Sequence, residues 1–217
     1  MKKKILLITF FLFFNLHAEE GFEVWIGNSL NKPISEKTSY NFYHEMDFKK
    51  FIGEPYYYIL DSSYIYKPLD KLSLSPTLRV GAIKTTNNFK KKWILEFSPI
   101  INVEYSFDVK EIEVYSHLKL MYRILQNQNS REVVRLKIGG KKVLKKSFAF
   151  FIDDEIFYNY NGFKKLDENR ATFGLNFEVN QSFNLNLYYL RDDYKFAQGR
   201  SWSSSNVLGL SLNINFK

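Results

Sequence analysis

A repeated two-residue period of hydrophobicity is the feature that most constrains this chain. From Trp93 to Phe107 every second residue is apolar, whereas the residues between them include Glu96, Asn102 and Glu104. Successive side chains of a β-strand point to opposite faces, so this spacing separates the two classes, while a helix would mix them. The segment is therefore predicted to be a strand with one hydrophobic and one polar face.

The same alternation recurs along most of the chain. The further runs lie at 22–30, 38–48, 56–66, 72–80, 112–124, 134–138, 147–159, 170–179, 183–189 and 208–216. Short turns are predicted near 32–36, 68–71, 108–110, 141–146 and 180–182, and longer polar loops near 49–55, 85–92, 125–131, 160–168 and 193–203. Short turns at one end and longer loops at the other are typical of outer-membrane barrels, in which the short turns face the periplasm.

Aromatic residues flank the predicted apolar faces. The chain is 18% aromatic, yet its mean hydropathy is −0.30, because apolar residues are spread singly rather than in long runs. Tyr and Trp near strand ends are typical of the girdles that barrels place at the two lipid–water interfaces. The girdle is expected to contain Tyr56, Tyr58, Tyr64, Tyr66, Trp93, Tyr105, Tyr122, Tyr158, Tyr189 and Trp202.

These patterns predict an all-β fold, an antiparallel up-and-down transmembrane β-barrel of 10 to 12 strands. The runs number eleven. Bacterial single-chain barrels have even strand numbers, so ten strands are favoured. The alternative is a secreted soluble barrel, similar to a lipocalin, whose apolar face points inward and binds a small apolar ligand.

The first residues have the composition of a secretory signal peptide. Three lysines at 2–4 precede an almost unbroken apolar stretch from Ile5 to Phe14, and a small residue, Ala18, ends the segment. This layout predicts a signal peptide at 1–18 and a barrel domain at 19–217, exported to a Gram-negative-type outer membrane. Three basic residues lie in the signal, which reduces the net charge from +8 to +5. Cys is absent, which excludes disulfides and thiolate metal sites.

The last run has the pattern of a barrel-assembly signal. Gly209 is followed by Leu212, Ile214 and Phe216, with an apolar residue at every second position, although Lys217 replaces the usual terminal aromatic. The expected partners are therefore the barrel-assembly machinery during biogenesis and outer-membrane lipid afterwards. Nucleic acid is not an expected partner of an exported protein.

Several segments resemble a family of bacterial outer-membrane proteins known as domain of unknown function 2490. They are Trp25-Ile26-Gly27, Leu30-Asn31-Lys32, the paired strands across 93–124, and Leu185-Asn186-Leu187-Tyr188-Tyr189 before a Gly-containing last strand. The resemblance spans nearly all of the mature chain. It implies the fold and the location, and it brings no catalytic residues.

Catalytic chemistry finds little support in the sequence. A lipid-modifying barrel enzyme would present His and Ser two residues apart on one strand face. The mature chain has only His44 and His117, and neither has a serine at that spacing. A pair drawn from separate strands, such as His117 with Ser98, stays open, although nothing in the sequence selects it. No catalytic residue, metal site or cofactor is predicted.

Charged residues on the polar faces of neighbouring strands are the best indication of function. The expected lumen-lining group is Arg79, Glu96, Glu104, Glu113, His117, Lys119, Arg123, Arg135 and Lys137. Mixed charges in a small barrel more often lock the interior by ion pairing than line a channel, and an open lumen is expected to prefer anions because of the basic excess. The sequence thus favours a non-enzymatic, porin-like barrel, either a narrow pore or a structural and surface-binding protein. A lipid-modifying barrel enzyme is the alternative.

Overall fold

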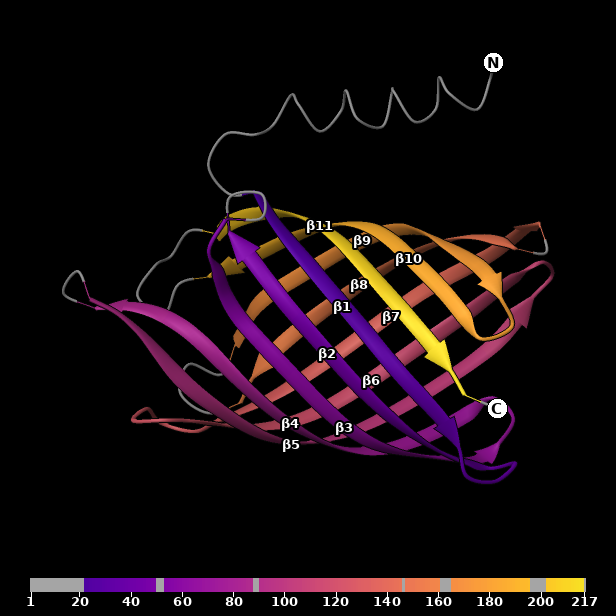
Figure 1. The fold of residues 1–217 in the computed structure, drawn as a ribbon, viewed down its shortest axis with the longest axis horizontal. Helices are drawn as coiled ribbons and strands as arrows, with labels where there is room; N and C mark the ends of the chain where they lie inside the picture. Colours follow the sequence, from indigo (N-terminus) through magenta and orange to yellow (C-terminus); the bar gives the residue numbers. More distant parts are fainter. Residues whose placement is uncertain are drawn as a thin grey trace, which may run out of the picture.

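The computed structural model describes residues 22–49, 53–87, 90–145, 147–160, 165–195 and 202–216. The predicted signal peptide and Lys217 lie outside these residues. Within the described chain, eleven strands form one closed barrel (Figure 1). They are β1 (Phe22–Pro33), β2 (Thr38–Lys49), β3 (Pro55–Leu69), β4 (Leu72–Asn87), β5 (Lys90–Val109), β6 (Ile112–Leu125), β7 (Arg131–Lys145), β8 (Phe148–Asn159), β9 (Lys165–Asn180), β10 (Phe183–Lys195) and β11 (Trp202–Asn215).

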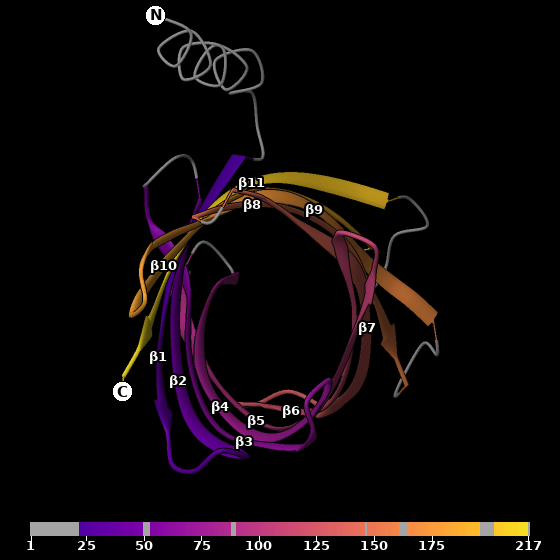
Figure 2. The same cartoon turned by 90° about the vertical axis from the view of Figure 1, so that its right-hand side faces the viewer.

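Each strand pairs antiparallel with the next, and the ring closes where β1 meets β11 (Figure 2). This last ladder is parallel, with Phe22 opposite Asn206 and Asn31 opposite Asn215. The predicted β-barrel of 10 to 12 strands is confirmed, whereas the preference for ten strands is wrong. Both terminal runs form full strands, and an odd number of alternating strands brings the first and last together pointing the same way.

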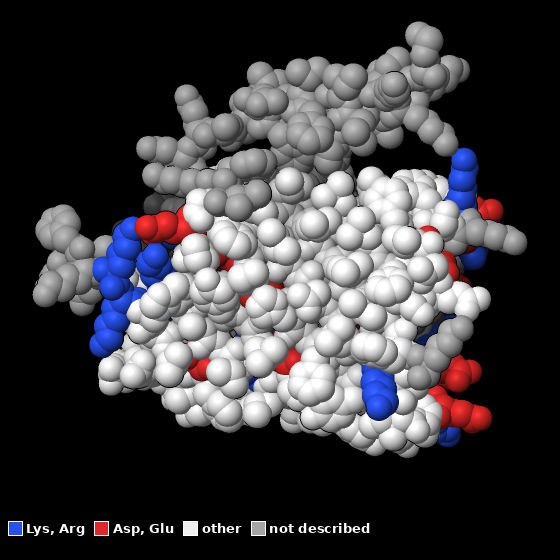
Figure 3. Space-filling view, viewed as in Figure 1, with Lys and Arg blue, Asp and Glu red and all other residues white. Residues whose placement is uncertain are grey.

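Alternation gives the barrel an apolar outer face and a polar inner face. Leu95, Ile101 and Ile138 are each more than half exposed, whereas Glu96 and Ser98 are almost completely buried. Soluble domains show the opposite distribution. Figure 3 shows Lys, Arg, Asp and Glu gathered mainly toward the two ends of the barrel, with other residues covering the face between them. The structure therefore differs from the lipocalin-like alternative, whose apolar side chains would point inward.

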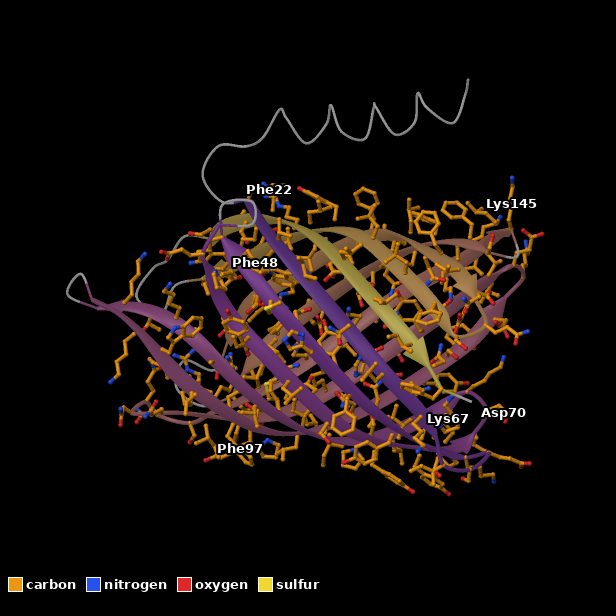
Figure 4. The ribbon with its side chains drawn as sticks, viewed as in Figure 1. Phe22, Phe48, Lys67, Asp70, Phe97 and Lys145 are labelled. Carbon is orange, nitrogen blue, oxygen red and sulfur yellow. The ribbon has the colours of Figure 1, made fainter. Side chains whose placement is uncertain are left out.

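The connections alternate between the two ends of the barrel. The short-turn end carries the connections at 34–37, 70–71, 110–111, 146–147 and 181–182, and the other, here called the long-loop end, carries those at 50–54, 88–89, 126–130, 160–164 and 196–201. Figure 4 places Phe22 and Phe48 at the long-loop end, opposite Lys67, Asp70 and Lys145. The loop expected near 85–92 is mostly strand. β4 continues to Asn87 and β5 begins at Lys90, and the two strands form a long projecting hairpin (Figure 1).

Large inward-facing rings lie directly against glycine backbones. Tyr188 is opposite Gly209 on one side and Gly174 on the other. A Cβ atom added to Gly209 would lie 1.9 Å from Cζ of Tyr188. Only glycine at this position leaves room for the inward-facing ring of Tyr188. None of the described residues forms a helix long and apolar enough to cross a membrane.

Candidate functional site: the barrel interior

The interior contains a cavity of about 890 Å³ lined by residues from all eleven strands. Most of the lining is polar, because the polar face of each alternating strand points inward. Nine lining residues are Asp or Glu and seven are Lys or Arg. The basic excess of the chain is therefore not found among the described residues that line the cavity. The surplus lysines lie instead on exposed turns and strand ends, as Lys37, Lys71 and Lys110 do.

Three arginines on one side of the interior each hold a carboxylate with two hydrogen bonds of 2.6 to 3.1 Å. The pairs are Arg79 with Asp61, Arg123 with Glu96, and Arg135 with Glu155. They connect β3 to β4, β5 to β6 and β7 to β8. We call this region the paired wall. Bidentate pairing of this kind fixes both side chains and satisfies the buried carboxylate oxygens.

Glu96 is the most enclosed member of the paired wall. Its side chain has no exposed surface, and it accepts further hydrogen bonds from Ser98 Oγ at 2.9 Å and Tyr57 Oη at 2.9 Å. These four donated hydrogen bonds compensate the loss of hydration that burial of a carboxylate entails. Ser98 is thus committed to Glu96, and the structure does not bring it to His117.

Lys119 differs from its neighbours on the same side. It lines the cavity directly opposite Arg135 in the β6–β7 ladder. No carboxylate of the described residues lies within ion-pair distance of its ammonium group. Nearby, His117 Nε2 lies 3.3 Å from Asn102 Oδ1 and 3.6 Å from Glu104 Oε1.

The opposite side of the interior, toward the long-loop end, gathers carboxylates from four strands. This acidic cluster consists of Glu23, Glu45, Asp47, Glu168 and Asp192, all of which line the cavity. Its cations, within the part of the chain that the structure describes, are Arg170 and Lys49. Arg170 Nη2 lies 2.7 Å from Glu168 Oε1, and its Nε lies 3.3 Å from Asp192 Oδ2. One guanidinium therefore serves two carboxylates.

Hydroxyl and indole groups donate hydrogen bonds to two carboxylates of the acidic cluster. Glu23 accepts hydrogen bonds from Trp25 Nε1 at 3.1 Å and from the Tyr56 hydroxyl, and Glu45 accepts one from the Tyr43 hydroxyl. Asp47 is 2% exposed, and its Oδ1 is buried without a hydrogen-bond partner among the described residues. The cluster thus has more carboxylate oxygens than the donors of the described residues satisfy.

Arg170 also connects two apolar patches inside the barrel. The patches are Ile100, Met121, Val133 and Phe157 on β5 to β8, and Trp25, Leu190 and Val207 on β1, β10 and β11. The guanidinium carbon lies 4.9 Å from the Trp25 ring centre and 4.8 Å from that of Phe157. A single side chain thus extends across the interior from β9 and touches rings on β1 and β8, which narrows the cavity at this level.

The expected lumen residues fall into three groups. Arg79, Glu104, His117, Lys119, Arg123, Arg135 and Lys137 line the cavity. Glu96 lies behind them, bonded to Arg123. Glu113 is exposed beside the β5–β6 turn and is not among the cavity-lining residues.

The expected girdle residues mostly lie on the outer face near strand ends. Those exposed by more than a third are Tyr64, Tyr66, Trp93, Tyr105, Tyr122, Tyr158 and Trp202. Tyr58 packs on Trp93 with ring centres 5.2 Å apart, and Tyr189 lies in the middle of β10, where its hydroxyl bonds Asn206. Tyr56 differs from the expectation, because its ring lines the cavity and its hydroxyl bonds Glu23.

The β11 residues expected in the assembly signal lie on two faces. Leu212, Ile214 and Phe216 occupy the same alternate positions as Leu210, which is 40% exposed on the outer face. Gly209 faces inward, beneath Tyr188.

The acidic cluster is the part of the site that sequence reasoning missed. Glu23, Glu45 and Asp47 lie on the polar faces of two weakly alternating runs, so parity alone indicated that they point inward. Their proximity to Glu168 and Asp192 depends on closure of the ring through β10, β11 and β1. That closure had no local sequence signature.

His44 and the acidic run at 153–155 do not form a common site. His44 points outward and contacts Asn28, with 3.4 Å between Nδ1 and Nδ2. Asp153 and Glu155 point inward, whereas Asp154 is exposed outside and accepts a hydrogen bond from Asn169. Among the described residues, no three His, Cys, Asp or Glu side chains are close enough together to hold a metal ion.

Comparison with known proteins agrees with this architecture. A family described as protein of unknown function DUF2490 matches residues 22–203. The chain belongs to this family. The DUF2490 match covers every strand from β1 to β10 and the start of β11. No curated protein matches the sequence significantly.

Solved structures similar to this DUF2490 chain are described as porins or as expressed in an outer membrane. The structure described as the NanC porin in a rhombohedral crystal form has a TM-score of 0.52 at 11% identity, covering 85% of this chain and 94% of that chain. An anion-selective porin from Comamonas acidovorans has a TM-score of 0.41 at 13% identity, with coverage of 83% and 54%. Outer-membrane expressed OmpT of Vibrio cholerae has a TM-score of 0.46 at 7% identity, with coverage of 78% and 61%. At these identities the first likeness shows the fold alone.

Proposed function

We propose that this chain is a narrow, non-enzymatic pore of a bacterial outer membrane that passes small polar solutes. The observation that carries the proposal is the combination of a charged cavity of about 890 Å³ with a ring of strands whose outer face is apolar. A polar cavity inside an apolar exterior suits a lipid-embedded channel, because lipid offers no partners for polar groups and a lumen needs them. Outer-membrane lipid and the barrel-assembly machinery are the partners that this proposal implies.

The charge distribution supports a small pore with a weak preference for cations. The lining has more carboxylates than Lys and Arg side chains, and the excess lies in the acidic cluster at the long-loop end. Arg170 and the two rings that it touches narrow the route beside this cluster. We expect low conductance for this reason, and cation rather than anion selectivity, which reverses the expectation from the net charge of the chain.

Planar-bilayer recording of the refolded mature chain tests the proposal. We expect small, discrete conductance steps and a reversal potential of the sign for cation preference across a KCl gradient. Arg170→Ala should increase the step size, because it removes the side chain between Trp25 and Phe157. The matched control is Arg191→Ala, since Arg191 is an exposed outer-face arginine paired with Asp193 and lies outside the cavity lining.

Absence of channels under every voltage and salt condition would contradict the pore and leave a structural or surface-binding role. Equal step sizes for Arg170→Ala and Arg191→Ala would contradict the proposed constriction. The non-enzymatic part is tested separately by incubation with labelled phospholipid and lipid A. We expect no product, because neither histidine is hydrogen-bonded to a serine in the described part of the chain.

A further inference from the structure

We infer that the acidic cluster is a binding site for small organic cations that carry ammonium or guanidinium groups. This inference deepens the proposed pore, and it rests on that function only for the route by which the cation reaches the cavity. The acidic cluster lies at the long-loop end of the interior, where β1, β2, β9 and β10 meet the cavity, so a ligand entering from that end meets it first.

Charge imbalance is the first observation in favour of a cationic ligand. Among the described residues, five carboxylates face two basic side chains, and one of these, Arg170, is shared between Glu168 and Asp192. The other, Lys49, lies opposite Glu23 in the β1–β2 ladder, with its ammonium over the Tyr56 ring rather than in an ion pair. Uncompensated carboxylates out of bulk water are costly, and a bound cation removes that cost.

Unpartnered buried oxygens are the second observation. Oδ1 of Asp47 and Oδ1 of Asp192 are both buried without a hydrogen-bond donor among the described residues, and the two residues are only 2% and 7% exposed. Both residues line the cavity. On the paired wall, by contrast, Asp61 and Glu155 each use both oxygens to accept from an arginine. The acidic cluster therefore has acceptors in place for donors that the described part of the chain does not supply.

Aromatic surfaces define the kind of cation. The Arg170 guanidinium lies 4.9 Å from the Trp25 ring centre, and the Lys49 ammonium lies 4.8 Å from that of Tyr56. These protein cations show that the site accommodates both groups over ring faces, an arrangement that stabilises organic cations. A directly ligated metal ion fits less well, because no three carboxylates or histidines of the described chain converge on one point. The chemistry therefore favours amines and guanidines over divalent metals.

The chain has a built-in reporter for this site. It has three tryptophans, and Trp25 lies beside the acidic cluster, whereas Trp93 and Trp202 are exposed on the outer face. A Trp93→Phe, Trp202→Phe background leaves Trp25 fluorescence as a local signal. The full mature chain is refolded in detergent micelles and titrated with putrescine, a four-carbon diamine, or with succinate, the four-carbon dianion, or with Ca²⁺. No current is measured, so failure to conduct and failure to bind are separate results.

We expect saturable quenching or enhancement by putrescine, and no saturation with succinate or Ca²⁺ at the same concentrations. Asp47→Asn should weaken putrescine binding about tenfold, as expected for loss of one charge-assisted contact. Asp192→Asn should have a similar effect and provides a second variant if the first does not fold. Asp154→Asn makes the same chemical change on the outer face and should leave the affinity unchanged. Heat-modifiable migration on gels verifies the fold of each variant.

Three results would overturn the inference. They are no saturable response to putrescine, an affinity that is the same in folded Asp47→Asn and Asp192→Asn as in Asp154→Asn, or a Ca²⁺ response as strong as that to putrescine. The last result would indicate charge screening rather than recognition of an organic cation.

Discussion

The two sides of the barrel interior treat buried charge in opposite ways. On the paired wall, each carboxylate held by an arginine is satisfied by two hydrogen bonds from neighbouring strands, as Asp61 is by Arg79. In the acidic cluster, one arginine is shared by two carboxylates, and one Asp47 oxygen has no hydrogen-bond donor among the residues that the structure describes. The first arrangement fixes strands to one another. The second leaves carboxylate oxygens available to accept hydrogen bonds, which is expected of a ligand site rather than of contacts that hold strands together.

Breaking the paired wall should produce the largest change in stability. Arg79→Ala leaves Asp61 buried without its partner, and we expect a loss of about 3–5 kcal/mol in the free energy of unfolding. Urea unfolding in detergent micelles measures the loss. The double variant Arg79→Ala, Asp61→Ala should recover most of it, because no uncompensated charge remains. A loss in the double variant equal to that of Arg79→Ala would show that packing rather than pairing holds this wall.

A methyl group placed under Tyr188 should have the next largest effect. Gly209→Ala would force the ring away from the wall next to the acidic cluster, and we expect a loss of about 1–3 kcal/mol from overpacking. Gly140→Ala is the matched control, because its nearest contact would be Ile112 Cγ2 at 3.5 Å, an ordinary distance. Equal unfolding midpoints for the two variants would contradict the close ring–backbone packing.

Removing an unpartnered carboxylate should stabilise the protein. Asp47→Asn removes a buried carboxyl group with one oxygen that lacks a donor among the described residues, so we expect the free energy of unfolding to rise by about 1 kcal/mol. The same change at Asp61, on the paired wall, should lower it. Chemical denaturation of both variants in one detergent sharpens the comparison directly. If both substitutions destabilise equally, the two sides do not differ in the way described.

The smallest effect is expected at an exposed ion pair on the long-loop end. Glu54 contacts Lys91 at 2.7 Å and Lys84 at 3.1 Å, and hydrogen bonds from these lysines lower the pKa of its carboxyl. Any stabilisation from Glu54 is therefore complete above its unfolded pKa and is lost as pH falls through the folded pKa. Because the pair is solvent-exposed, Glu54→Gln should leave the thermal unfolding midpoint unchanged at neutral pH. A measurable shift would mean that this loop contributes to the stability of the barrel.

The sequence predicted the strands and their two faces because alternation is a local property. The run from Trp93 to Phe107 identifies Glu96 as an inward residue without any knowledge of its neighbours. Period alone does not reveal a register change, however. The ladder between β2 and β3 shifts between Asp47 and Phe48, which is why Tyr56 lies inside rather than in the girdle.

Long-range pairing was the part that sequence could not provide. The acidic cluster joins residues from Glu23 to Asp192, and its members meet only because β1 and β11 close the ring in parallel. An even number of strands, which the sequence analysis favoured, would have closed the ring with an antiparallel ladder. The alternation along each strand therefore predicts which side chains point inward, whereas ring closure determines which of them face one another.

Quenching of single tryptophans by lipids brominated near their headgroups tests the central claim most directly. Variants that retain only Trp93, only Trp202 or only Trp25 are refolded into such bilayers. Trp93 and Trp202 are 37% and 42% exposed on the outer face, whereas Trp25 is 6% exposed inside. We expect strong quenching of the two outer tryptophans and little quenching of Trp25. Stronger quenching of Trp25 than of the other two would contradict a barrel whose apolar face meets lipid and whose charged face lines its interior.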